Sequence, residues 1–268
     1  MLKISLAVAL ATGVLGTLAT STAKAGYTQG FEFATTGDFT NSIIQNPNPN
    51  VNWALKNNSD SVNSNGAWNV AGLAAPLGFN AQSGSPGSYA YVGADSTLAF
   101  TSSTTISNWF MTPTLQFGVN DTVSFWTRTA GTISSSTTPS IYPDRLQVLL
   151  STSGSSVNVG TTASSVGVFT QALGDINPSY VTTTVTSTGP DGYPITWTQY
   201  TYAIPQNNFQ GRIGFRYLIQ DTSIRGNAIG LDTFSTTANL VPEPSSFALM
   251  GLGLAALAYR RLKGRKSA

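Results

Sequence analysis

The chain has 268 residues, of which 9% are charged, and it contains neither cysteine nor histidine. Disulfide bridges, thiol chemistry, histidine-based catalytic triads and nearly all zinc sites are therefore excluded. The net charge of +2 does not indicate nucleic-acid binding, because the basic excess lies at the two ends, and residues 26–240 hold six basic against ten acidic residues.

The N-terminus has the pattern of a secretory signal peptide. Lys3 precedes an apolar stretch at 4–18, and the small residues that follow end in Ala23-Lys24-Ala25. A cationic start, an apolar centre and an A-x-A site are the features that signal peptidase recognises. We therefore predict a signal helix in residues 1–25, export through the Sec translocon and cleavage before Gly26. A retained N-terminal anchor is the alternative.

Residues 26–240 contain short segments with alternating apolar residues and no sustained helical period. The clearest predicted strand is 211–219, and 121–128 and 145–150 alternate in the same way. Weaker strands are expected at 30–33, 89–93, 97–100, 198–204 and 229–234. Turns rich in glycine, proline and asparagine separate these segments, which is typical of one all-β domain built as an antiparallel β-sandwich.

Long polar connections at 41–66, 131–142 and 182–193 are predicted to be mobile cover or binding loops. Trp53 and Trp68 are the best candidates for exposed sugar-stacking residues, because they lie in the first polar stretch or directly after it. The alternative is that all five tryptophans are core residues or loop anchors.

The acidic residues of this region form no catalytic motif. Glu32 is the one glutamate between residues 26 and 240, and nine aspartates are scattered around it in sequence. A glycan hydrolase or lyase based on two carboxylates stays open as the enzymatic alternative. We expect a protein without catalytic activity.

Seven segments in order resemble the choice-of-anchor J domain of bacterial surface proteins. Two of them are Asp175-Ile176-Asn177-Pro178 and Ile229-Gly230-Leu231-Asp232, and the other five lie at 106–113, 121–128, 142–148, 197–200 and 211–217. The resemblance covers about 27–236 and implies a jelly-roll sandwich related to MAM and cleaved-adhesin domains. It implies no activity.

Related sandwiches often hold a structural calcium ion where the first and last strands meet. Here those strands offer Glu32 and Asp232, and six to eight oxygen ligands would also require Asp38, Asp95 and backbone carbonyls. No calcium-loop motif is present, so carboxylates in solvent or hydrogen-bonded to a turn are the alternative.

The C-terminus has three parts: Pro242-Glu243-Pro244, an uncharged apolar segment at 245–259, and a basic end. The apolar segment would span about 22 Å as a helix, a marginal transmembrane length. The basic end predicts that the C-terminus stays cytoplasmic; its cations are Arg260, Arg261, Lys263, Arg265 and Lys266.

Residues 241–268 therefore resemble a PEP-CTERM sorting signal of Gram-negative bacteria that make exopolysaccharide. The resemblance implies transient anchoring in the inner membrane, cleavage near Pro242-Glu243-Pro244 by an exosortase-like membrane protease, and transfer to the cell surface or release. An ordinary tail anchor is the alternative. We expect an exported surface or matrix protein associated with biofilm exopolysaccharide, and a carbohydrate-binding module as the alternative function.

Overall fold

The computed structural model describes residues 26–32, 43–46, 48–60, 68–71, 79–84, 91–95, 104–130, 142–182 and 192–241, and β-strands dominate them. The first half contains β1 (Tyr27–Gln29), the 3₁₀ helix η2 (Pro49–Val51), β2 (Ala54–Asn57), β3 (Asn69–Ala71), β4 (Tyr91–Asp95), β5 (Ile106–Met111), β6 (Leu115–Phe117) and β7 (Thr122–Thr129). The second half contains β8 (Leu146–Ser151), β9 (Gln171–Ile176), β10 (Thr198–Ala203), β11 (Phe209–Ile219), β12 (Ala228–Thr236) and β13 (Asn239–Leu240).

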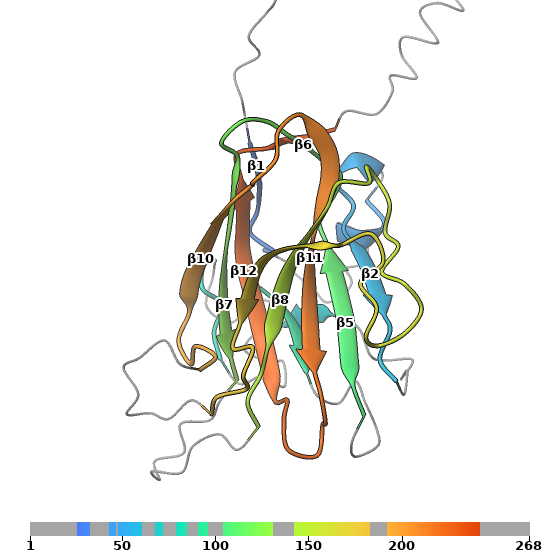
Figure 1. Ribbon diagram of the computed structural model, residues 1–268. Coiled ribbons are helices and arrows are strands. Elements are labelled where there is room, and N and C mark those ends of the chain that lie inside the picture. The colour runs from blue at the N-terminus through green and yellow to red at the C-terminus, as the bar shows by residue number, and fades with distance from the viewer. Residues whose placement is uncertain are drawn as a thin grey trace, which may run out of the picture.

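Within the described residues, the strands form two antiparallel sheets. The six-stranded sheet has the order β10-β7-β12-β4-β3, with β1 also paired to β12. The seven-stranded sheet has the order β13-β6-β11-β5-β2, and β8 pairs with both β11 and β9. Figure 1 shows β10, β7 and β12 in one layer and β8, β11, β5 and β2 in the other. The predicted all-β antiparallel sandwich is confirmed.

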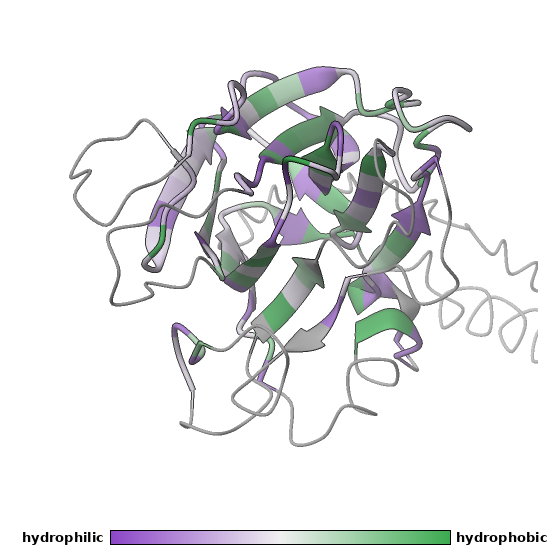
Figure 2. Ribbon diagram, turned by 90° about the horizontal axis from the view of Figure 1, so that it is seen from below, coloured by the Kyte–Doolittle hydropathy of each residue, from purple (hydrophilic) through white to green (hydrophobic). Residues whose placement is uncertain are grey.

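The hydrophobic core lies between the two layers. Phe125 of β7 and Phe215 of β11 meet edge to face, with ring centroids 4.9 Å apart, and Phe234 of β12 also contacts Phe215 at 6.1 Å. Such side chains come from alternate strand positions, because successive residues of a strand point to opposite faces. Figure 2 shows the pattern as green hydrophobic bands that alternate with paler or purple ones on several strands.

The strongest sequence predictions agree with this core. Val123 and Phe125 of β7 are buried, while Ser124 and Arg128 are half-buried on the other face. The predicted inward faces of the other two segments are also buried in the core; they consist of Leu146, Val148 and Leu150 on β8, and Ile213, Phe215, Tyr217 and Ile219 on β11.

Two predictions need correction. A strand was predicted at 30–33, but the strand lies earlier, at Tyr27–Gln29, and Phe31 has a φ of 55°, which ends extended backbone. The polar stretch 41–66 was predicted to be a loop, but it contains η2 and β2, which pairs with β5 through Leu55 and Phe110. The predicted strand 97–100 and most of the other two long connections lie outside the described residues.

Candidate functional site

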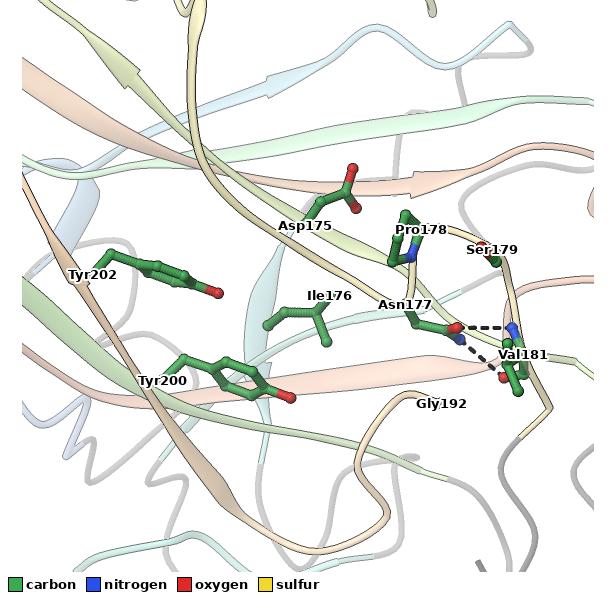
Figure 3. Close-up of a pocket in the computed structure, with 9 residues that line it drawn as sticks. All are labelled: Asp175, Ile176, Asn177, Pro178, Ser179, Val181, Gly192, Tyr200 and Tyr202. Atoms are coloured by element: carbon green, nitrogen blue, oxygen red, sulfur yellow. Dashed lines mark hydrogen bonds between the residues drawn. The ribbon is translucent and has the colours of Figure 1, made fainter. Parts of the chain in front are cut away.

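A cavity of about 610 Å³ lies where β9, at the edge of one sheet, faces β10, at the edge of the other. Tyr200 and Tyr202 form one side of it, and the end of β9 with the following turn forms the other. Figure 3 shows both tyrosine rings extending side by side from β10, with their hydroxyl groups at the same end. The remaining described residues that line the cavity are Asp175, Ile176, Asn177, Pro178, Ser179, Val181 and Gly192.

The alternation of β10 places both tyrosines on its inner face. Tyr200 and Tyr202 are half-buried, while the residues between and beside them are exposed. Tyr200 pairs directly with Phe125 of β7, and their rings lie 6.0 Å apart at 19°. The two tyrosine rings are 6.5 Å apart at 17°, so they form a nearly parallel pair. No hydrogen bond of either phenol hydroxyl is found among the described residues.

The opposite wall is fixed by Asn177, which is buried at a φ of 59°. Its amide nitrogen donates to the backbone carbonyls of Asp144 and Val181, at 2.9 and 3.0 Å, and its amide oxygen accepts from the Val181 N–H at 2.7 Å. Tyr180 in the same turn donates its hydroxyl to the Leu218 carbonyl at 2.9 Å. Asparagine tolerates the left-handed region better than most residues, so this side chain both permits the turn and fastens it.

The carboxylate of Asp175 is neutralised by Arg145. The guanidinium donates from Nε and from one terminal nitrogen to the two carboxylate oxygens, at 2.8 and 2.6 Å, and Gln147 donates to the same carboxylate at 3.0 Å. The hydrogen bonds to Asp175 raise the pKa of Arg145 above its ordinary value. In Figure 3 the carboxylate points away from the two tyrosine rings, so the cavity presents no free charge from this residue.

The prediction that Trp53 and Trp68 are exposed for sugar stacking is wrong. Both side chains are 1% exposed. Trp53 stacks on Phe110 with ring centroids 4.4 Å apart, and Trp68 also lies against Phe110 at 5.8 Å. Their indole N–H groups are satisfied inside the protein, by the Tyr27 hydroxyl at 3.0 Å and by the Asn108 carbonyl at 3.1 Å. Burial of the large apolar indole ring is favourable even though the neighbouring residues in the sequence are polar.

Two of the predicted calcium ligands, Asp232 and Glu32, both contact Ser83 but are used differently. Asp232 is fully buried and accepts hydrogen bonds from the backbone N–H groups of Gln82, Ser83 and Thr233, at 2.8, 3.2 and 2.6 Å. Glu32 is exposed and accepts from the Ser83 hydroxyl at 3.3 Å. Burial raises the pKa of Asp232 to about 6, although the backbone hydrogen bonds act in the opposite direction.

This donor set does not fit a calcium ion as it stands, because three N–H dipoles already point at the Asp232 oxygens. Among the described residues, no three histidine, cysteine, aspartate or glutamate side chains lie close enough to hold a metal ion. Asp38 and the side chain of Asp95 lie outside the described residues.

Most residues of the two sorting signals also lie outside the described residues. These residues are Ala23, Ala25, Pro242, Glu243, Pro244, the apolar segment 245–259 and the five cations of the basic end. Gly26 is described and precedes β1. In the part of the chain that the structure covers, no helix is long and apolar enough to cross a membrane.

The family model of the PEP-CTERM protein-sorting motif matches residues 240–263. The C-terminus carries a PEP-CTERM sorting motif. This motif marks an exported protein that is sorted to the cell surface. The match begins at Leu240, the last residue of β13, so the PEP-CTERM motif directly follows the sandwich.

Solved structures similar to this chain include cleaved adhesin domains of Lys-gingipain from Porphyromonas gingivalis W83. The K1 domain is 17% identical with a TM-score of 0.47, covering 80% of this chain and 98% of its own. The K3 domain is 19% identical with a TM-score of 0.42, covering 69% and 90%. The CBM22-1 xylan-binding domain of Paenibacillus barcinonensis Xyn10C is 12% identical with a TM-score of 0.35, covering 82% and 100%. No curated protein is detectably similar to the sequence.

Proposed function

We propose that this protein is a non-catalytic surface or matrix protein of a Gram-negative bacterium, held briefly in the inner membrane and then processed by an exosortase-type protease. The proposal is supported above all by the PEP-CTERM match at 240–263, which begins at the final residue of the last described strand, β13. In this proposal, residues 1–25 are the signal peptide, 26–240 the jelly-roll domain that is exported, and 241–268 the removable tail.

The proposed sequence of events follows from the physical properties of the two ends. The apolar segment 245–259 holds the chain in the membrane, and the basic residues after it keep the end on the cytoplasmic side. Pro242-Glu243-Pro244 then lies just outside the membrane, extended because proline disfavours helix there. Cleavage at this point frees a weakly acidic β-sandwich, which we propose associates with exopolysaccharide in the biofilm.

The absence of catalysis in this proposal is supported by the chemistry of the cavity. Hydrolysis of a glycosidic bond by two carboxyl groups needs them about 5 to 9.5 Å apart on either side of the bond. Asp175 is the one carboxylate among the described residues that line the cavity, and it is paired with Arg145 at 2.6 Å.

Substitution of the motif tests the processing step. In a host with the sorting system, we expect Pro242→Ala/Glu243→Ala/Pro244→Ala to accumulate in the inner membrane at the mass of the tailed chain. The matched control Ser245→Ala/Ser246→Ala leaves the motif and the basic end intact and should be processed like the wild type. Equal processing of the motif variant and the wild type would contradict the proposal.

A structural calcium ion at Glu32, Asp232, Asp38 and Asp95 remains a separate prediction. It requires Asp232 to exchange at least part of its backbone hydrogen bonds for a cation. If the ion is present, EDTA should lower the melting temperature in calorimetry; an unchanged melting temperature would remove the calcium site.

A further inference from the structure

We propose that the cavity between β9 and β10 binds a neutral hexose unit of an extracellular polysaccharide, with Tyr200 and Tyr202 as its main contacts. The inference rests on the exopolysaccharide association proposed above and gives it a site and a ligand class. The exposed-tryptophan site considered from the sequence is thereby replaced by a tyrosine site between the edge strands β9 and β10.

The shape of the aromatic pair suits a sugar ring. A hexopyranose has a face of C–H groups and a rim of hydroxyl groups, so it binds where an apolar surface lies beside polar groups. Tyr200 and Tyr202 supply this combination, since their nearly parallel rings are half-buried and line a cavity of about 610 Å³. Phe125 backs Tyr200 from within the core, so part of the aromatic surface is already held in place.

The two phenols have hydrogen-bonding capacity that the described residues do not use. Buried or half-buried tyrosine hydroxyls usually find a partner, yet neither hydroxyl has one among the described residues. Burial raises the pKa of Tyr200 and raises that of Tyr202 to about 12, so both groups stay protonated and can donate as well as accept. Sugar hydroxyls also do both, so they match these groups.

The charge of the described lining also favours a neutral ligand. The carboxylate of Asp175 is neutralised by Arg145 and turned away from the rings, so the described residues that line the cavity offer neither a free cation for an anionic ligand nor a free carboxylate for a cationic one. The domain as a whole is weakly acidic, with six basic and ten acidic residues between 26 and 240. A neutral sugar is therefore favoured over a uronic acid or an amino sugar.

The cavity walls are held in place by contacts within the protein before any ligand binds, which lowers the entropic cost of binding. The turn after β9 is fastened by three hydrogen bonds of the Asn177 side chain. The tip of the Tyr202 ring lies against Gly174 of β9, where a Cβ would collide with it. The ring therefore has a fixed position between the two sheet edges.

Isothermal titration of the full chain with cellohexaose, laminarihexaose and mannohexaose tests the site. We expect at least one of these neutral oligosaccharides to bind. Tyr200→Ala and Tyr202→Ala should each raise its Kd by about tenfold or more, because the apolar contact is lost. The matched controls Gln199→Ala and Thr201→Ala lie on the same strand but on its exposed face, and should bind like the wild type.

If an alanine variant has a lowered melting temperature, the phenylalanine variants Tyr200→Phe and Tyr202→Phe are used in its place. They keep the ring and lose the hydroxyl, and we expect about a threefold weakening. The proposal is overturned if none of the three oligosaccharides binds, or if folded alanine variants keep wild-type affinity. Where an alanine variant is not folded, wild-type affinity of both phenylalanine variants overturns it. Processing at the PEP-CTERM motif is measured by mass and does not depend on these results, so failure of the sugar site is distinguishable from failure of the sorting proposal.

Discussion

Asp144 is a buried carboxylate that organises its surroundings without an ion pair among the described residues. It is 1% exposed and accepts hydrogen bonds from the hydroxyls of Thr129 and Tyr217, at 2.5 and 2.7 Å, and from the Asn227 N–H at 2.8 Å. Burial raises its pKa above the ordinary value, and the hydrogen bonds act against that increase. The Asp144 carboxylate therefore links β7, β11 and the residue before β12, although its removal from water costs free energy.

Substitution of Asp144 should change how stability depends on pH. Because the folded-state pKa is raised, the contribution of this group to stability is complete below the unfolded-state pKa and is lost as the pH rises through the folded-state value. In Asp144→Asn the amide oxygen still accepts from the Tyr217 hydroxyl and the Asn227 N–H. The amide nitrogen can donate to the Thr129 hydroxyl, because that hydroxyl can donate to the Ala228 carbonyl instead. We therefore expect the stability of Asp144→Asn relative to the wild type to increase as the pH is raised above the ordinary aspartate pKa, measured by urea unfolding over a series of pH values.

Asp144→Ala is the contrasting variant. It leaves the Tyr217 hydroxyl and the Asn227 N–H without their acceptor, which should cost about 1–3 kcal/mol for each group. A stability difference between Asp144→Asn and the wild type that does not change with pH would contradict the raised pKa of Asp144.

Trp53 should be one of the most costly residues to truncate. It stacks on Phe110 and meets Phe31 and Phe234 edge to face, with centroids 5.3 and 5.2 Å away. Trp53→Ala should reduce the free energy of unfolding by about 3–5 kcal/mol. Trp197→Ala, at a half-buried indole, is the matched control and should cost less. Similar losses in chemical denaturation would contradict the central place of Trp53 in the core.

The burial of the two tryptophans could not be predicted from the sequence around them. Trp53 follows Asn48, Pro49, Asn50 and Asn52, and this polar context predicted exposure. The direction of a side chain depends instead on the strand that follows it and on the facing layer, here β2 with β5 and the aromatic cluster around Phe110. Tyr200 and Tyr202 could be placed on one face of a strand from their spacing, but not beside β9.

At the scale of elements, periodicity predicted the long strands and missed the shortest ones. β7 and β11 have eight and eleven residues, enough for several alternations. β6 and β13 have three and two residues and are defined by their partners, not by their own pattern. The pairing of strands is also decided by the whole fold, since β10 joins β7 and β9 joins β8 in different sheets. The cavity arises from that arrangement, so the sequence pattern did not reveal it.

The turn after β9 allows a prediction about one element. Asn177→Ala removes three hydrogen bonds and places alanine at a φ of 59°, whereas Asn177→Gly removes the same bonds without the backbone cost. We expect both variants to be destabilised, and Asn177→Ala by about 1–2 kcal/mol more than Asn177→Gly. Equal unfolding free energies in urea would show that the left-handed backbone does not contribute.

At the scale of the whole molecule, charge and hydrophobicity separate the ends from the domain between them. Seven of the 13 basic residues lie in residues 1–25 and 260–268, beside the two apolar segments. The domain between them is a sandwich whose first described strand, β1, pairs with β12, and whose last, β13, pairs with β6. This separation suits terminal segments that direct the chain and are then removed, since neither is needed to complete a described strand pair.

Intact-mass and terminal-peptide mass spectrometry of the protein recovered from its native cells is the decisive test of the proposed export and processing. We expect a mature chain that begins at Gly26, ends at or close to Pro242-Glu243-Pro244, and is found at the cell surface or in the medium. A chain recovered from the cytosol with residues 1–25 and 245–268 still attached would contradict it.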